Sequence, residues 1–334
     1  MREPHFWTKP NSISAFLLAP LSGIYRFISR LRMTLATPQK TQAPVICIGN
    51  FTMGGAGKTP VTDFIAQALK ENGWQPAILS RGYGGHLKEA IAVDLSQHNS
   101  EDVGDEPFML AQRHNVFIGK DRVISATLAT QSGHNILIKD DGFQNPGLYH
   151  DINILVADGE KGFGNGRIFP AGPLREFADD ALSRTDIVVV MGAPTGNGME
   201  EFIGKCHGRA VPVFHAKIKP RSVSLDKTKP VLAYCAIARP QKFYNTLAEM
   251  GFNIGLTRDF SDHHYFSEAE AQSLLQQADK ENLSLITTEK DAARLSHLGK
   301  SAHYRNMLLE RTKVLPIDID ISDEFMSHIF SRLR

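Results

Sequence analysis

The sequence predicts an α/β fold in which a mostly parallel sheet carries helices on both faces. Three observations predict it. Short apolar segments alternate with segments of helical period from Val45 onward, a glycine-rich loop joins the first apolar segment to a helix, and polar loops follow several later apolar segments. Ligands of such folds bind beyond the carboxyl ends of the strands, where these polar loops fall.

Each expected strand is a short apolar run that ends at a polar or glycine-containing turn. A helix follows most of these runs, and apolar residues recur at helical spacing within it, as they do between Val61 and Leu69. The expected strands include residues 45–48, 77–79, 91–93, 116–118, 135–138, 152–156, 187–190, 231–236 and 285–288.

The loop after the first strand has the residues of a phosphate-binding loop and ends on Gly57-Lys58-Thr59. Backbone N–H groups and a helix N-terminus would face a polyphosphate there, Lys58 would reach the β and γ phosphates, and Thr59 would ligate Mg²⁺. Thr52 stands where the usual pattern has glycine, so a chance match in a glycine-rich turn is the alternative. The expected nucleotide-binding residues are Thr52, Met53, Gly54, Gly55, Ala56, Gly57, Lys58 and Thr59.

Two pairs of carboxylates follow apolar or glycine-containing segments. Asp140 and Asp141 end an expected strand, as a Mg²⁺-holding aspartate does in many P-loop enzymes, although an ordinary strand-end turn has the same pattern. Asp105 and Glu106 stand at a loop–helix junction, where a carboxylate could act as a base or lie around the metal, or could simply cap the helix.

A histidine pair and several arginines are further candidates. His263 follows Asp262 in a polar loop and could be a base or its orienting partner, or the start of a helix capped by a Ser267–Glu270 capping box. Residues 162–176 form the densest Gly/Pro stretch, and a loop of this length inside a domain suggests function. In it Arg167 and Arg175 could bind an anionic substrate, which Arg81 and Tyr83 of the glycine-rich loop 80–85 could share. Singly, each arginine could be a surface residue.

The N-terminal segment differs from the rest of the chain. No acidic residue occurs between Pro4 and Thr62, and Ile24, Phe27 and Ile28 share one helical face. The uncharged run 10–25 contains a proline and is short for a membrane span. We therefore expect a pair of basic amphipathic helices in the membrane interface, with packing on the protein's own core as the alternative.

These features divide the chain into three expected parts. They are the membrane-interface helices at 1–35, a P-loop NTPase-like core at 36–215, and linker strands with a smaller α/β domain at 216–334. The length allows two domains, and the net charge of +1 argues against a nucleic-acid binder. The three cysteines lack metal-ligand spacing and are expected in the core. No obligate protein partner is evident.

Taken together, these stretches resemble the tetraacyldisaccharide 4′-kinase family of lipid A biosynthesis. The resemblance covers most of the chain, and the Thr52 loop is typical of that family. It is carried by the segments 49–60, 80–85, 103–107, 140–144, 169–176, 237–241, 262–263 and 287–291. After Gln144 the family commonly has histidine, whereas this chain has Asn145.

The resemblance implies transfer of the γ phosphate of ATP to the 4′-hydroxyl of a lipid disaccharide 1-phosphate, giving lipid IV-A. It implies ATP and Mg²⁺ as cofactors, an anionic membrane surface as partner, and attachment to the cytoplasmic face of the bacterial inner membrane. By position it implies Asp105 as base, coupled to His263, with Lys58 and Asp141 in the catalytic set. It further implies Thr59, Glu106 and Asp140 around the metal, and Gln144, Arg175 and Glu176 around the reacting centre.

Two other functions stay open at this point. One is a P-loop ligase or kinase of a soluble small molecule, which would have no use for the basic apolar N-terminus. The other is a membrane-associated nucleotide switch, which does not require a second domain that presents Asp262 and His263 to the γ phosphate. Measured phosphate transfer to the lipid disaccharide would separate the three.

Overall fold

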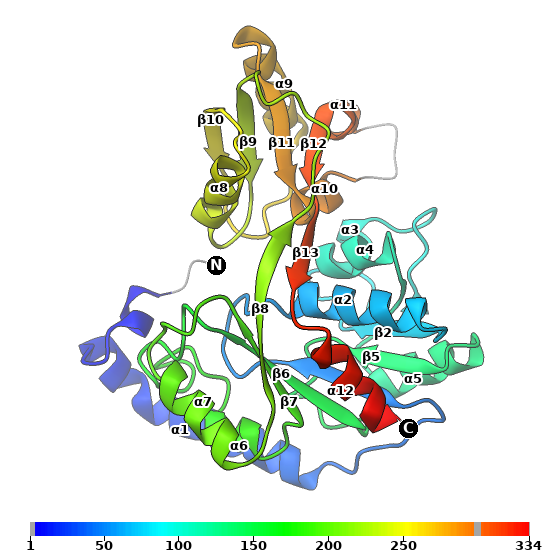
Figure 1. Cartoon of the computed structure of the whole chain (residues 1–334), viewed down its shortest axis with the longest axis vertical. Helices are drawn as coiled ribbons and strands as arrows, with labels where there is room; N and C mark the ends of the chain where they lie inside the picture. The colour runs from blue at the N-terminus through cyan, green and yellow to red at the C-terminus, as the bar shows by residue number, and fades with distance from the viewer. Residues whose placement is uncertain (1–3, 297–301, 334) are drawn as a thin grey trace.

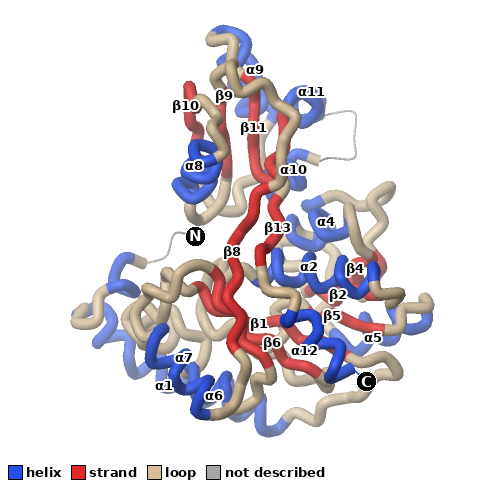
Figure 2. Tube along the Cα trace, viewed as in Figure 1, coloured by secondary structure: helices blue, strands red, loops and turns tan. Residues whose placement is uncertain are grey.

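A computed structural model describes residues 4–296 and 302–333 of the chain (Figure 1). In these residues the strands form a nine-stranded sheet and a four-stranded sheet. We call the first sheet with its helices the large unit and the second sheet with its helices the small unit. Figure 2 shows a narrow two-stranded connection between them.

The large sheet has the strand order β13-β8-β7-β6-β1-β5-β2-β4-β3. Its neighbours pair in parallel except at the two edges, where β3 and β13 are antiparallel. The strands are β1 (Val45–Gly49), β2 (Pro76–Ser80), β3 (Ile91–Ala92), β4 (Asn115–Ile118), β5 (Ile136–Lys139), β6 (Ile152–Asp158), β7 (Ile187–Met191), β8 (Val213–Pro220) and β13 (Ile317–Asp320).

Helices cover both faces of the large sheet. Successive residues of a strand point to opposite faces, so a buried strand places apolar side chains on both. Ile46 and Ile48 of β1 contribute to a core with α2 and α12, whereas Val45 faces α5 and Cys47 faces α6 and α7. The helices are α2 (Lys58–Glu71), α3 (Ser100–Val103), α4 (Asp105–Ala111), α5 (Arg122–Gln131), α6 (Ala178–Leu182), α7 (Met199–Gly208) and α12 (Glu324–Leu333). The three cysteines are buried and free, as expected.

The small unit is a parallel sheet with the order β10-β9-β11-β12. The predicted capping box is confirmed, since Ser267 and Glu270 bond reciprocally at the start of α9. The sequence did not predict β10, whose residues are mostly exposed and include no apolar run. The elements are β9 (Val231–Cys235), α8 (Pro240–Glu249), β10 (Ile254–Asp259), α9 (Glu268–Lys280), β11 (Ser284–Thr288), α10 (Glu289–Leu295), α11 (His303–Arg311) and β12 (Thr312–Leu315).

The connection between the units consists of β8 and β13. The first half of β8 pairs with β7 of the large sheet, and its second half pairs with β13. The linker strands expected at the start of the 216–334 unit therefore include the second half of β8. The end of the chain differs from the expected 216–334 unit, because α12 returns to the large unit and buries Phe325 and Ile329 in its core (Figure 1).

The N-terminal segment is one long helix rather than the expected pair. A 3₁₀ turn, η1 (His5–Thr8), precedes α1 (Ile13–Leu35), which continues through Pro20. A narrow face of α1 is fixed by Ser22, whose hydroxyl donates to the Ile168 carbonyl at 2.7 Å. Ala15 is also buried, and Leu18, Tyr25 and Met33 are half-buried. Nine large apolar side chains of α1 are exposed, namely Ile13, Phe16, Leu17, Leu21, Ile24, Phe27, Ile28, Leu31 and Leu35. Within the described residues, α1 and every other helix are too short or too polar to cross a membrane.

The docking of α12 gives a first prediction. Phe325 is fully buried, and its ring contacts those of Phe64 and Phe214 at centroid distances of 6.3 and 5.3 Å. Phe325→Ala should lower the free energy of unfolding by about 3–5 kcal/mol, because it leaves a cavity in the core. Urea unfolding would measure the loss. The exposed Ser331→Ala on the same helix is the control, and equal stability of the two variants would contradict this packing.

Candidate active site

The site lies at the carboxyl end of β1, in the middle of the large sheet. Because β1 pairs in parallel with β5 and β6, the segments that follow these three strands meet at one edge. Cys47 is in register with Lys139, so the glycine-rich loop 50–57 and the Asp140–Asp141 segment leave the sheet side by side.

The glycine-rich loop has backbone conformations that favour glycine. Gly54 and Gly57 have φ values of 92° and 91°, and a Cβ on Gly57 would lie 2.8 Å from the Met191 side chain. Thr52 is buried, forms an antiparallel backbone bridge with Leu174 and is not among the residues of positive φ, so its conformation does not require glycine. Gly54 and Gly55 are exposed, so the loop backbone is open to a ligand.

Lys58 is held over the loop by two oxygens. Its Nζ lies 3.2 Å from Asn50 Oδ1 and 3.5 Å from Asp141 Oδ1. Asn50 also donates to the Thr52 carbonyl at 2.8 Å, so it connects the lysine to the loop backbone. Asn50 was not predicted to have a role, because a single asparagine in a loop carries no distinguishing pattern.

The two aspartates after β5 have different environments. Asp140 is buried and accepts from the Thr62 hydroxyl at 3.1 Å, and burial together with the negative charge of Glu106 raises its pKa to about 6. Asp141 adopts a left-handed backbone conformation with φ of 49°. Burial opposes its ionisation, but Lys58 and Arg175 outweigh this effect and lower its pKa. Asp141 is thus a stable carboxylate, whereas Asp140 is crowded by other negative charges.

A second set of predicted residues is joined to Asp141. Arg175 donates to Asp141 Oδ1 at 2.8 Å and to Gln144 Oε1 at 3.1 Å. Gln144 in turn donates to Glu176 Oε1 at 2.8 Å. Glu176 also pairs with Arg184 at 2.6 Å, a residue that the sequence did not indicate because it lies in an ordinary turn after α6. The structure therefore brings Gln144, Arg175 and Glu176 together beside the loop.

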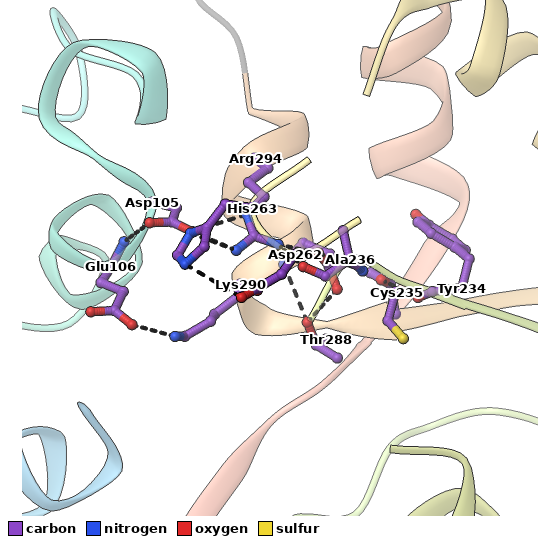
Figure 3. Close-up of polar contacts among 12 residues, drawn as sticks. Asp105, Glu106, Tyr234, Cys235, Ala236, Asp262, His263, Thr288, Lys290 and Arg294 are labelled. Atoms are coloured by element: carbon purple, nitrogen blue, oxygen red, sulfur yellow. Dashed lines mark hydrogen bonds and ion pairs between the residues drawn. The ribbon is translucent and has the colours of Figure 1, made fainter. Parts of the chain in front are cut away.

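Asp105 and His263 meet across the two units (Figure 3). Asp105 is the first residue of α4 and is 4% exposed, and its Oδ2 lies 3.0 Å from His263 Nδ1. Burial opposes ionisation of Asp105, but the hydrogen bond from His263 and the charge of Arg294 keep its pKa far below the ordinary range. The hydrogen bond with Asp105 raises the pKa of His263. The pair therefore favours a carboxylate next to an imidazolium.

Two basic residues of α10 complete this contact, and neither was a predicted site residue. Arg294 donates to Asp105 Oδ2 through Nε at 3.0 Å and Nη2 at 2.5 Å, and Lys290 pairs with Glu106 (Figure 3). The charge of Lys290 lowers the pKa of Glu106, although burial opposes it. Lys290 lies in the segment 287–291, one of the segments that carry the family resemblance, and Thr288 of that segment caps α10.

Arg81 and Tyr83 lie on the exposed glycine-rich loop that follows β2. The Tyr83 ring is 74% exposed, and its centroid is 6.4 Å from that of His263. The structure therefore brings Tyr83 near the Asp105–His263 pair, whereas Arg81 is exposed at the base of the same loop.

The Gly/Pro-rich loop 162–176 links α1 to the glycine-rich loop 50–57. On one side it accepts the Ser22 hydroxyl at Ile168 and the Trp7 indole N–H at Pro170. On the other side its Pro173 carbonyl accepts from the Met53 N–H at 2.6 Å. The loop thus holds both the N-terminal helix and the expected nucleotide-binding residues.

Comparison with known proteins gives a family assignment for the chain. A family model described as tetraacyldisaccharide-1-P 4′-kinase matches residues 14–334. The chain belongs to the tetraacyldisaccharide 4′-kinase family. A member of that family from Parvibaculum lavamentivorans is 45% identical over 328 residues, which cover 97% of this chain and 95% of that one. Another, from Rhodopseudomonas palustris strain HaA2, is 43% identical over 297 residues, which cover 88% and 87%.

The fold of this tetraacyldisaccharide 4′-kinase family member also has a solved counterpart. The crystal structure titled as an "apo" form of LpxK from Aquifex aeolicus in complex with ATP gives a TM-score of 0.73. The two are 24% identical, and the match covers 96% of this chain and 99% of that one. At this identity the likeness shows the fold, and the predicted fold class is confirmed.

The Asp105–His263 contact predicts a pH-dependent stability. Because the folded state raises the pKa of His263, the contact stabilises most below the unfolded pKa of about 6.5 and weakens as the pH rises through the folded pKa. The free energy of unfolding lost in His263→Gln should therefore be larger at pH 6 than at pH 9. Chemical unfolding at both values would measure it. The exposed His207→Gln on α7 is the control, and a pH-independent loss in His263→Gln would contradict the assigned contact.

Proposed function

We propose that this protein is an ATP-dependent kinase that transfers the γ phosphate to the 4′-hydroxyl of tetraacyldisaccharide 1-phosphate, giving lipid IV-A in lipid A biosynthesis. One observation carries the proposal. A phosphate-type loop with Lys58 lies at the same sheet edge as Asp141, and across the adjoining interface Asp105 is bonded to His263 of the second unit. The description of the family names tetraacyldisaccharide 1-phosphate, and this lipid is the acceptor that we propose for the site.

Phosphate binding would fall to the loop 52–59. The exposed backbone of Gly54 and Gly55 can donate N–H groups to phosphate oxygens, and Lys58 adds a positive charge. The ammonium group of Lys58 is already ordered by Asn50 and Asp141, so it needs little reorganisation when the γ phosphate arrives.

The residues near Asp140 suit a magnesium ion. In the described part of the chain, no group of three or more His, Cys, Asp and Glu side chains is arranged to hold a metal, so an ion would also need hydroxyl and phosphate oxygens. Thr59 is buried in the first turn of α2, and the pKa of Asp140 is raised to about 6 by burial and by Glu106 and Asp141. A divalent cation would relieve that crowding. Mg²⁺, when bound, would be held by Thr59 and Asp140 with Glu106 nearby, and it would neutralise phosphate charge.

The acceptor hydroxyl would be activated by Asp105 and His263. Its oxygen forms a bond to the γ phosphorus, the bond from that phosphorus to the bridging oxygen breaks, and ADP leaves. When His263 is a neutral imidazole, the hydroxyl proton passes to the Asp105–His263 pair, which then holds a carboxylate next to an imidazolium and later releases the proton. The His263 side chain is 45% exposed, so a bound acceptor can reach the imidazole while Asp105 stays buried.

The sugar and its phosphate would lie among Arg175, Gln144 and Glu176, with Tyr83 on the side of His263 and Arg81 at the base of the same loop as Tyr83. One N–H group of the Arg175 guanidinium donates to Asp141, and this hydrogen bond orients the guanidinium beside Asp141. Tyr83 offers a largely exposed ring to a sugar face.

The exposed face of α1 supports attachment to the surface of a membrane. Nine large apolar side chains on this helix are 45–79% exposed. Soluble monomeric proteins rarely expose so many apolar side chains together unless the surface binds a membrane or another protein. Arg26 and Arg30 lie 3.7 Å from Asp180, and Arg26 also stacks on Phe177 at 4.4 Å, so part of their charge is already paired. The apolar side chains would therefore supply most of the binding, at the cytoplasmic face of the inner membrane where the family's pathway places its substrate.

This arrangement disfavours the two other functions. A kinase of a soluble molecule has no need for the exposed apolar face of α1. A nucleotide switch has no need for an Asp–His pair assembled from two units. Transfer of phosphate from ATP to tetraacyldisaccharide 1-phosphate in detergent micelles, followed by product mass, tests the proposal. Hydrolysis of ATP with no phosphorylated lipid would favour the switch.

Replacement of Lys58 gives a direct prediction. Lys58→Ala removes the charge that stabilises the transferring phosphoryl group, so kcat should fall by about 10²-fold or more. The initial rate of lipid phosphorylation measures it. Lys70→Ala, at the exposed far end of α2, is the matched control. Near-normal turnover in a folded Lys58→Ala protein would sink the assignment of this loop.

The membrane proposal is tested on the exposed face of α1. Phe16, Leu17 and Phe27 are 71%, 70% and 68% exposed, so their replacement by serine should leave the fold intact. Each substitution should weaken the free energy of partitioning into lipid by about 1.5 kcal/mol or more, which corresponds to roughly a tenfold lower partition coefficient. The triple variant should move from anionic vesicles to the supernatant on sedimentation. Ile124→Ser, which changes a 57% exposed apolar residue on α5, is the control. Unchanged sedimentation of the triple variant would show that α1 does not bind lipid.

A further inference from the structure

Arg294 is a fully buried arginine that touches both units. Its side chain is 1% exposed, and it comes first by size among the fully buried side chains of the described residues. Nε and Nη2 donate to Asp105 Oδ2 of the large unit, while Nη1 donates to the Ala236 carbonyl at 2.6 Å and to Asp291 Oδ1 at 2.7 Å in the small unit. A buried charge of this kind is costly unless it is fully paired, as it is here.

The small unit holds this guanidinium rigidly. Asp291 is itself fully buried, accepts from the Ala236 N–H at 3.2 Å and pairs with the Thr288 hydroxyl at 2.6 Å. The Ala236 carbonyl also accepts from the backbone N–H of His263 at 3.3 Å. Arg294 and His263 are therefore both hydrogen-bonded to Ala236, at the end of β9. Contacts within the small unit alone fix their spacing, without Asp105.

Both partners bind the same carboxylate oxygen. Oδ2 of Asp105 faces His263 Nδ1 at 3.0 Å and the two Arg294 N–H groups, and Arg294 Nη2 lies 3.4 Å from His263 Nδ1. The other oxygen, Oδ1, accepts from the backbone N–H of Glu106 at 3.0 Å. Arg294 thus determines which oxygen is turned toward the histidine.

We propose that Arg294 is a positioning residue that orients Asp105 toward His263, so that the base is assembled only when the small unit is docked on the large one. The inference rests on the proposed function and adds a residue to it. Arg294 does not reach the acceptor, because it is buried behind the pair. Its effect on the reaction is transmitted through the direction of one carboxylate.

A purely structural contact between the units is the alternative, and the chain offers a matched control for it. Arg113, just after α4, pairs with Glu289 of α10 at 2.5 Å and with Asp63 of α2 at 3.0 Å. This ion pair joins the same two units at the same pair of helices and does not touch Asp105. Arg113→Met therefore weakens the interface without changing the base.

The experiment measures kcat, KM for ATP and thermal stability in Arg294→Met, Arg294→Lys and Arg113→Met. Arg294→Met should lower kcat by about 10²-fold, the loss expected from a displaced catalytic group, and change KM for ATP less than threefold. Arg294→Lys, which keeps the charge but not the fork, should recover part of kcat. Arg113→Met should keep kcat within twofold even if it melts earlier. An equal loss of kcat in Arg113→Met would overturn the proposal.

A second measurement asks whether Arg294 acts through Asp105. In an Asp105→Asn background the base is absent, so the added Arg294→Lys substitution should lower kcat by less than a further twofold. Fully multiplicative losses would mean that Arg294 acts elsewhere and would overturn the proposal. If Arg294→Met does not fold, the lysine variant alone decides, and normal kcat in it rejects the assignment.

The two proposals fail in different ways. Wild-type protein that does not phosphorylate the disaccharide rejects the proposed function and this inference with it. Active wild-type protein together with normal kcat in Arg294→Met and Arg294→Lys rejects the positioning role alone.

Discussion

The parallel pairing of β1 with β5 is the constraint on which the site depends. It places the loop after one strand and the aspartates after the other at the same edge, so that Lys58 and Asp141 lie within 3.5 Å of one another. The hydrophobic faces of both strands are buried, and a slip of one residue would turn every side chain to the wrong face. Packing of the strands against α2, α5 and α12 therefore fixes the register of β1 and β5. The register in turn places Lys58 close to Asp141.

The second constraint is the contact between the units. The chain passes from the large sheet to the small one at β8 and returns at β13, and these strands pair with each other. Charged side chains of α10 meet α4 beyond that connection, with Arg294 on Asp105 and Lys290 on Glu106. Because these groups are buried or half-buried, each needs its partner, and the interface is specific for one relative placement of the two units.

The loop 162–176 connects the N-terminal helix α1 with the glycine-rich loop that follows β1. It holds Ser22 and Trp7 at one side and the backbone of Met53 at the other. Arg175 and Glu176, the last two residues of this loop, lie beside Asp141 and Gln144. A lipid substrate that enters from the surface covered by α1 would thus meet the residues proposed for its head group without crossing the protein.

The sequence by itself determined the local features of this protein. Glycines before Lys58 and Thr59, aspartates at the end of an apolar run, and the Ser267–Glu270 capping box are each set by neighbours along the chain, so pattern and spacing predict them. The alternation of strands and helices predicted the fold class for the same reason. Asp105 and His263 could be named as candidates, but only the folded chain places them 3.0 Å apart across 158 residues.

Tertiary structure alone decided the rest. Arg294 lies 189 residues from Asp105 and looks like any arginine in a helix, and Asn50 and Arg184 likewise carry no local signal. The return of α12 to the large core and the single course of α1 through Pro20 also depend on distant surfaces. Periodicity reports which residues of a segment share a face, whereas the partner of that face is set by the packing of segments that the sequence does not bring together.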